Sequence, residues 1–202
     1  MVGLIDEGRS YRFLIDPLLK YQHKKVLMHI SPDKRVLDVA CGTGALALKI
    51  AAKAQHVTGI DLSESMIDLA KSTQQKRKIS NAEFRVTDAT NLSEFHDNEF
   101  DVGVMAMAVH QFPRTVAKQI LLEMKRVAKT LVVLDYNHQM SPGFGKTVIY
   151  FIEWLAGGEH HRSFLDYMKN RGIYSIIEEC GLKIKPDPIN RKSLFSLVQC
   201  CK

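Results

Sequence analysis

Two glycines separated by one residue, Gly42 and Gly44, follow an apolar run that starts at Val36. Glycine permits a sharp turn and lets a ligand approach the backbone closely. The alanine-rich segment that follows has a helical pattern, and the N-terminus of a helix presents unpaired N–H groups to an anionic or polar ligand. The spacing therefore predicts a ligand-binding turn between a strand and a helix, although nicotinamide and flavin proteins use a similar glycine pattern.

Three acidic residues accompany the predicted strands. Asp38 lies within the apolar run, where a carboxylate suits a cationic ligand better than a pyrophosphate. Asp61 ends a predicted second strand, where an acid can accept hydrogen bonds from both hydroxyls of a ribose. Asp88 follows a predicted third strand, and an aspartate in such a turn can also accept hydrogen bonds from its own backbone.

The strand and helix patterns place these residues at one edge of a sheet. Apolar runs and helical stripes alternate along the chain, which predicts an open, doubly wound α/β sheet. Ligands of such sheets bind beyond the carboxyl ends of the strands, at the switch in strand order. Gly42, Asp61, Asp88 and Met105 all fall at that edge. After the first apolar run, the predicted strands cover residues 56–61, 82–86, 99–106, 130–135, 182–185 and 193–201.

Helical segments precede and follow this alternating region. Asp16 and Pro17 make a good helix start, and residues 1–31 are expected to form an N-terminal lid and a leading helix. Residues 137–181 contain helical stripes rich in aromatic side chains, which are expected to form a helical insertion that caps the substrate site. No repeat or linker divides the chain, so residues 1–202 are expected to form a single domain.

The run from Val36 to Gly44 resembles the first motif of the class I S-adenosylmethionine-dependent methyltransferases, and residues 106–112 look like the motif after the family's fourth strand. The closest likeness is to small-molecule enzymes of the type found in ubiquinone and menaquinone biosynthesis (methyltransferase type 11), and it covers most of the chain. The resemblance implies a Rossmann-like, doubly wound sheet of seven strands. That sheet is mostly parallel, with an antiparallel last strand and a helical insertion after strand five.

The resemblance also implies the cofactor S-adenosylmethionine, with S-adenosylhomocysteine as its product. In the family the glycine turn holds the methionine part, whose sulfonium is positive. An acid that matches Asp88 binds the adenine amino group, beside a backbone N–H. The residues assigned to the cofactor in this way are Asp38, Ala40, Gly42, Gly44, Asp61, Leu62, Met66, Asp88, Ala89 and Met105.

Methyl transfer is an in-line displacement, for which an enzyme holds the donor carbon and the acceptor atom roughly 3 Å apart. A general base is needed only where the acceptor loses a proton, as a phenol or an enol does. The motif match places His110 near the methyl group as the candidate base, with a structural histidine as the alternative. The aromatic residues of the insertion form either core or a lid over a ring-containing acceptor. The residues expected in the acceptor pocket are Tyr11, Tyr150, Trp154, His160 and Phe164.

Composition limits the other function classes. A chain of 202 residues with 46% hydrophobic and 25% charged residues is typical of a soluble globular domain, and it has no apolar run of bilayer-spanning length. The four cysteines have no metal-ligand spacing, so no metal site is expected, and they are typical of reduced thiols in a cytoplasmic protein without a secretory signal. The basic residues behind the net charge of +6 are scattered, so no nucleic acid is expected, whereas peripheral membrane contact stays open.

Several alternatives remain beside a methyltransferase that acts on a small molecule, such as a quinone precursor or another ring compound. Gly42, Gly44 and Ala47 also satisfy the looser fingerprint of a nicotinamide-dependent oxidoreductase. A protein that binds S-adenosylmethionine without catalysis would share the same cofactor site. A phospholipid headgroup also stays open as the acceptor, given the basic balance and the aromatic insertion. The sequence does not indicate the oligomeric state.

Overall fold

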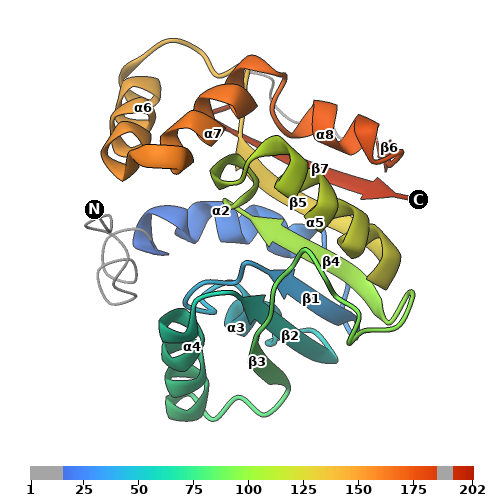
Figure 1. Ribbon diagram of the computed structural model, residues 1–202. Coiled ribbons are helices and arrows are strands. Elements are labelled where there is room, and N and C mark those ends of the chain that lie inside the picture. The colour runs from blue at the N-terminus through green and yellow to red at the C-terminus, as the bar shows by residue number, and fades with distance from the viewer. Residues whose placement is uncertain (1–15, 186–192) are drawn as a thin grey trace.

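The computed structural model describes residues 16–185 and 193–202, which form a seven-stranded sheet flanked by helices (Figure 1). The strand order is β3-β2-β1-β4-β5-β7-β6. The strands from β3 to β5 pair in parallel, whereas β7 runs antiparallel to both β5 and β6. This arrangement confirms the predicted fold class. The strands are β1 Arg35–Val39, β2 His56–Asp61, β3 Ala82–Val86, β4 Phe100–Ala106, β5 Ala128–Tyr136, β6 Lys183–Ile184 and β7 Phe195–Cys201.

The helices alternate with the strands and then gather after β5. The helix α2 covers Asp16–Met28, within the predicted leading segment, and residues 1–15, expected to form the lid, lie outside the described residues. In Figure 1, α6 and α7 lie on the β5 side of the sheet and α4 lies beside β3. The helices are α2 Asp16–Met28, α3 Ala47–Ile50, α4 Glu64–Lys76, α5 Arg114–Val127, α6 Phe144–Ala156, α7 Gly158–Lys169 and α8 Ile173–Glu179, with a short 3-10 helix η1 at Val109–Gln111.

The sheet is buried where the sequence is continuously apolar. Residues 131–134 of β5 are apolar and all buried, as expected of a central strand covered on both faces, and Asp135 and Tyr136 at its end are buried as well. On the other side, the ring of Phe84 on β3 occupies a notch between two glycines. A Cβ atom on Gly44 would lie 2.7 Å from this ring, and one on Gly59 would lie 2.6 Å from it. Gly44 therefore does more than turn the chain, because it lets the first strand–helix unit pack on β3.

The helix after the glycine turn is shorter than predicted. The sequence favours a helix from Ala45 to Ala54, but the regular helix α3 covers only Ala47–Ile50. The N–H of Lys49 donates to the carbonyl of Leu46 at 2.9 Å, three residues back, and other bonds in this segment have the same short spacing. The segment keeps its helical direction, but these tighter turns interrupt the regular pattern on both sides of α3.

Within residues 16–185 and 193–202, no helix has both the length and the apolar character needed to cross a bilayer.

Candidate functional site

The carboxyl ends of β1 and β2 are joined through the side chain of Asp61. The N–H of Gly42 donates to Oδ2 of Asp61 at 2.8 Å, and the N–H of Ser63 donates to Oδ1 at 2.9 Å. The backbone carbonyl of Asp61 accepts from the N–H of Thr87 at 3.1 Å, just after β3. Asp61 therefore fixes the glycine turn, the start of α4 and the end of β3 relative to one another. Each of its carboxylate oxygens keeps accepting capacity for a further donor.

Asp38 on β1 is a buried carboxyl group with an unsatisfied oxygen. Its side chain is 2% exposed, the N–H of Ala47 donates to it, and Oδ2 has no hydrogen-bond partner among the described residues. Burial, and then the charge of Asp61, raises the pKa of Asp38 to about 8, so the group is mostly neutral at pH 7. A buried polar atom without a partner is costly, and a cationic or hydrogen-donating ligand would satisfy this one.

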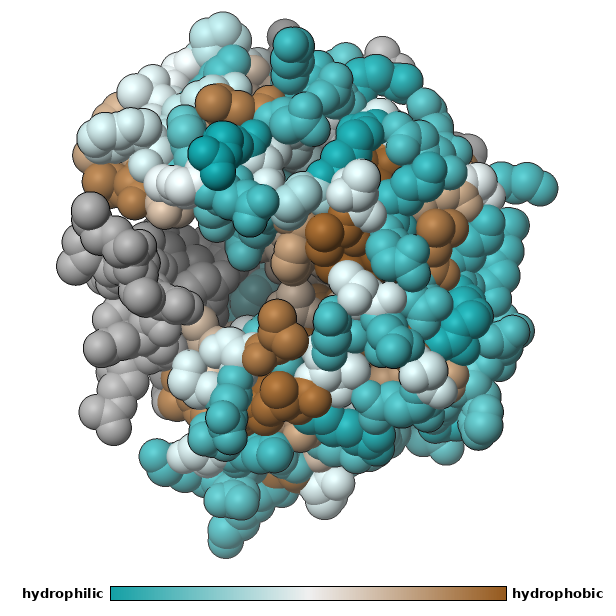
Figure 2. Space-filling view, viewed as in Figure 1, coloured by the Kyte–Doolittle hydropathy of each residue, from teal (hydrophilic) through white to brown (hydrophobic). Residues whose placement is uncertain are grey.

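The backbone is strained at the tips of the two central strands. Ala40, directly after β1, has a φ of 54°, and Met107, directly after β4, has a φ of 58°. Residues with a Cβ atom rarely adopt this left-handed conformation, and such residues concentrate at functional sites. Gly42 has a φ of 52° and no atom within 4 Å of the place where a Cβ would stand. In Figure 2, the face of the molecule turned to the viewer has a hollow near its middle. The tip of β4 lies at this place in Figure 1, which has the same view.

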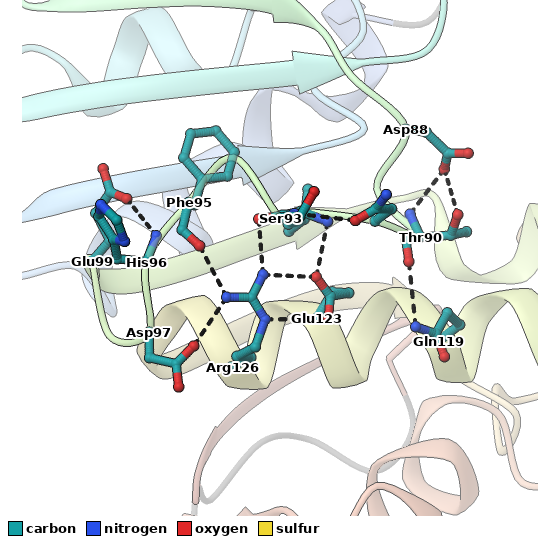
Figure 3. Close-up of polar contacts among 12 residues, drawn as sticks. Asp88, Thr90, Ser93, Phe95, His96, Asp97, Glu99, Gln119, Glu123 and Arg126 are labelled. Carbon is teal, nitrogen blue, oxygen red and sulfur yellow. Dashed lines mark hydrogen bonds and ion pairs between the residues drawn. The ribbon is translucent and has the colours of Figure 1, made fainter.

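The segment after β3 is held against α5 by Arg126 (Figure 3). Its guanidinium donates to the carbonyls of Leu92 at 2.8 Å and Phe95 at 2.9 Å, and it pairs with Glu123 at 2.8 Å. Asp88 lies in this segment, where its Oδ1 accepts from the N–H of Thr90 at 2.9 Å and from the hydroxyl of the same residue at 2.8 Å. Asp88 thus makes the local turn that the sequence allowed as an alternative, and its Oδ2 has no hydrogen bond among the described residues.

A second group of polar residues is buried between η1, β5 and the helical insertion. We call it the histidine cluster, and it consists of His110, Asp135, Tyr136, Glu153 and His160. The Nδ1 atom of His110 lies 2.6 Å from Oδ1 of Asp135. Asp135 is itself held by the backbone N–H groups of His110 at 3.2 Å and Tyr136 at 2.7 Å. The ring of His110 is therefore fixed by a carboxyl group that the backbone orients.

Glu153 of α6 forms the other side of the histidine cluster. Its Oε1 accepts from the hydroxyl of Tyr136 at 2.9 Å, and its Oε2 lies 2.6 Å from Nε2 of His160 on α7. The Nε2 atom of His110 lies 3.5 Å from Oε1 of Glu153. His110, Glu153 and His160 each offer one ligand atom, and these atoms lie within 4.8 Å of one another, so the three residues could hold a metal ion.

Charge pairing sets the protonation of the histidine cluster. Burial lowers the pKa of His110, but the charge and hydrogen bond of Asp135, together with the charge of Glu153, outweigh it and raise that pKa. Burial raises the pKa of Glu153, but the hydrogen bond from His160, followed by the charge of His110, outweighs it and lowers that pKa. Both shifts favour the charged forms, the imidazolium of His110 and the carboxylate of Glu153.

Several known proteins similar to this chain are methyltransferases. A protein-family profile described as a methyltransferase domain matches residues 36–130. A demethylmenaquinone methyltransferase of Thermotoga maritima is 28% identical over 201 residues, which cover 90% of this chain and 84% of the relative. The chain is an S-adenosylmethionine-dependent methyltransferase with the fold of the class I enzymes. The nicotinamide-dependent alternative is therefore not supported.

Solved structures show the same fold for this methyltransferase. A SAM-dependent methyltransferase from Aquifex aeolicus has a TM-score of 0.69 at 21% identity and covers 96% of this chain and 97% of its own. The magnesium protoporphyrin IX methyltransferase from Synechocystis, solved with bound S-adenosylhomocysteine, has a TM-score of 0.62 at 18% identity over 100% of this chain and 89% of its own. The cofactor of the methyltransferase is S-adenosylmethionine.

The residues predicted to bind the cofactor differ in how far they are exposed to solvent. Leu62, after β2, is 71% exposed, and Ala89 is half-buried beside Asp88. Met66 stands in the first turn of α4, where its N–H donates to the Ser63 hydroxyl at 3.4 Å. The side chain of Met105 is only 1% exposed and packs in the core of the sheet. Ala106, the next residue of β4, is half-buried.

Three of the predicted acceptor residues come together in the methyltransferase. The ring centroid of Phe164 lies 5.0 Å from that of Tyr150 and 6.2 Å from that of His110. His160 belongs to the histidine cluster, which also contains His110. Trp154 does not join them, because it is 60% exposed and stacks on Phe151. Tyr11 lies outside the described residues.

The sequence prediction missed Glu153, on which the histidine cluster depends. Glu153 is the only acidic residue of α6, and its side chain is 5% exposed. A single carboxyl group in a helix that is apolar nearly all round is a signal that could have identified it, because buried acids are rarely left without partners.

Proposed function

We propose that this methyltransferase holds S-adenosylmethionine across the tips of β1, β2 and β3 and methylates a small ring compound, such as a quinone precursor. The bridge that Asp61 makes between Gly42 and Ser63 supports the cofactor position most directly. The printed name of the Thermotoga relative, demethylmenaquinone methyltransferase, supports a quinone-like acceptor. The four cysteines are free thiols, in keeping with a reduced, cytoplasmic location.

Each strand tip has a distinct role in this proposal. The oxygens of Asp61 accept the two ribose hydroxyls while they keep their backbone donors. The open space beside Gly42 admits the methionine part, and the unsatisfied Oδ2 of Asp38 attracts its positive charge. The Oδ2 atom of Asp88 accepts the adenine amino group, and the exposed Leu62 covers the adenine ring.

The chain needs no covalent nucleophile for this reaction. When bound, S-adenosylmethionine supplies a methyl group on a positively charged sulfur atom. A lone pair or ring carbon of the acceptor forms the bond to the methyl carbon, and the electrons of the breaking C–S bond remain on sulfur. A hydroxyl or ring C–H acceptor then releases one proton to water or to a neighbouring base. The residues of the protein contribute by fixing the in-line approach and excluding water.

We test the proposal with the full-length protein, a methyl-labelled donor and a panel of hydroxylated naphthoquinols, simple phenols and phospholipid vesicles. We expect label to enter a ring compound with equal formation of S-adenosylhomocysteine. Label in the phospholipid alone would contradict the ring acceptor. If calorimetric titration detected no binding of S-adenosylmethionine or S-adenosylhomocysteine, the proposed cofactor site would be wrong.

The role of Asp38 predicts that binding of S-adenosylmethionine depends on pH. With its pKa raised to about 8, Asp38 is mostly protonated at pH 6.5, and a cationic ligand favours its ionised form. Binding must then release that proton, so the affinity rises as the pH increases toward 8 and levels off above it. We expect an increase of about tenfold between roughly pH 6.5 and 8.5, measured by calorimetry.

The matched control for this measurement is Asp38→Asn, which has no proton to release. The α-amino group of the ligand also titrates near pH 8, so the two proteins are compared at each pH and the ratio of their affinities is plotted. A ratio that stays constant over the range would show that the ligand does not ionise Asp38.

A further inference from the structure

The histidine cluster contains a donor set built from three separate elements. His110 comes from η1 after β4, Glu153 from α6 and His160 from α7. Their ligand atoms lie within 4.8 Å of one another. Two imidazoles and one carboxylate are a donor set that divalent transition-metal ions prefer. Cysteine spacing could not reveal this site, which explains why the sequence predicted no metal.

The orientation of His110 matches that of a metal ligand. Its Nδ1 lies 2.6 Å from Asp135, which carries no hydrogen of its own as a carboxylate, so Nδ1 holds the ring proton. In the neutral ring the Nε2 atom, which faces Glu153, carries the lone pair that a metal ion would bind. Histidines that bind metals characteristically donate their other N–H to a carboxylate in this way, and the hydroxyl of Tyr136 supports Glu153 from behind at 2.9 Å.

One contact between the proposed metal-binding residues is longer than a hydrogen bond. The 3.5 Å between Nε2 of His110 and Oε1 of Glu153 exceeds the usual length of an N–H···O hydrogen bond. Two carboxyl groups, those of Asp135 and Glu153, are buried here at 0% and 5% exposure. Their ion-pair partners in this structure are the rings of His110 and His160, and uncompensated buried charge is costly. A divalent ion would balance both.

The surroundings allow an ion to enter and then be shielded. His160 is the accessible donor, with 32% of its side chain exposed, whereas His110 is 3% exposed. The rings of Tyr136 and Phe164 pack 4.6 Å and 6.2 Å from the ring of His110. In the metal-bound form, the present contact of 2.6 Å between Glu153 and His160 would give way to separate bonds of about 2.0–2.2 Å from each residue to the ion.

We propose that His110, Glu153 and His160 bind one divalent transition-metal ion, with Asp135 as the positioning residue of His110. The ion joins the helical insertion to the end of β4, and it occupies the ring nitrogen that a catalytic base would need. His110 is then a ligand rather than the base that the sequence suggested. The site does not depend on the identity of the methyl acceptor.

The test uses full-length protein that has been freed of metal with a chelator and then titrated with Zn²⁺, followed by Co²⁺ as a spectroscopic probe. We expect one Zn²⁺ per chain at this site, visible absorption bands of Co²⁺ bound to nitrogen and oxygen, and a higher melting temperature with Zn²⁺. Glu153→Gln and His160→Ala should each weaken binding by at least about 30-fold, and Asp135→Asn by about tenfold or more.

His161→Ala is the matched control, because His161 neighbours His160 on α7 but lies outside the donor set. This variant should bind Zn²⁺ within about threefold of the parent protein. His160→Gln provides a second variant if His160→Ala is unfolded by circular dichroism. The proposal is overturned if folded parent protein binds no Zn²⁺ at about 100 µM, or if Glu153→Gln and His160→Gln bind it as the parent does.

Discussion

Asp61→Ala is expected to lower the affinity for S-adenosylhomocysteine by about 100-fold or more. Each carboxylate oxygen of Asp61 accepts a backbone N–H and, in the proposed complex, one ribose hydroxyl as well. A hydrogen bond to a charged group contributes roughly 1.5–3 kcal/mol, so the loss of two such bonds removes about two to four factors of ten. The substitution also frees the Gly42 turn, which would no longer be held in the shape that receives the ligand.

The measurement is calorimetric titration with S-adenosylhomocysteine, with thermal unfolding recorded on the same samples. Asp61→Asn keeps one acceptor oxygen and should give an intermediate loss. Glu64→Ala is the matched control, since Glu64 is an exposed acid in the first turn of α4. Unchanged affinity in a folded Asp61→Ala protein would refute the proposed cofactor position.

Gly44→Ala is expected to destabilise the protein by roughly 2–4 kcal/mol. Its φ of 70° strains any residue that carries a Cβ, and the new Cβ would lie 2.7 Å from the ring of Phe84 and 2.9 Å from the Cβ of Ala70. The ring cannot simply move away, because Phe84 is 4% exposed and also presses against Gly59. Chemical denaturation of the two proteins measures the difference in the free energy of unfolding.

Gly42→Ala is the matched comparison for this prediction. Gly42 has a similar φ of 52°, but nothing lies within 4 Å of its Cβ position, so only the backbone strain of about 1–2 kcal/mol is expected. Adding Phe84→Leu should recover part of the stability of Gly44→Ala and none of that of Gly42→Ala. Equal destabilisation by the two alanine substitutions would show that the Phe84 notch does not matter. Gly42→Ala should instead weaken cofactor binding, because the methyl group enters the proposed ligand space.

Local signals in the sequence were sufficient to predict where several strands of the sheet begin and end. The predicted bounds of β2 and β3, residues 56–61 and 82–86, agree with the structure. A local marker follows β2, because Ser63 caps the next helix. The acid at the tip of β2 could also be assigned to the edge of the sheet, since strand direction follows from the alternation of strands and helices.

The sequence of a central strand does not indicate which of its side chains contact a ligand. Met105 lies near the tip of β4, as predicted, yet its side chain is in the core. A strand covered on both faces is apolar at every position, so its sequence has no alternation that separates the two faces. The left-handed conformations of Ala40 and Met107 were likewise invisible, because nothing in an alanine or a methionine signals positive φ.

The sequence by itself determined the fold class, the glycine turn and the acids at the strand tips, because each depends on residues close together in the chain. Only the tertiary structure decided that Phe84 needs Gly44, and that Glu153 brings His110 and His160 into one buried cluster. These contacts join residues from separate elements. Their energy comes from burial and charge pairing, which arise only when the sheet and the helical insertion pack together.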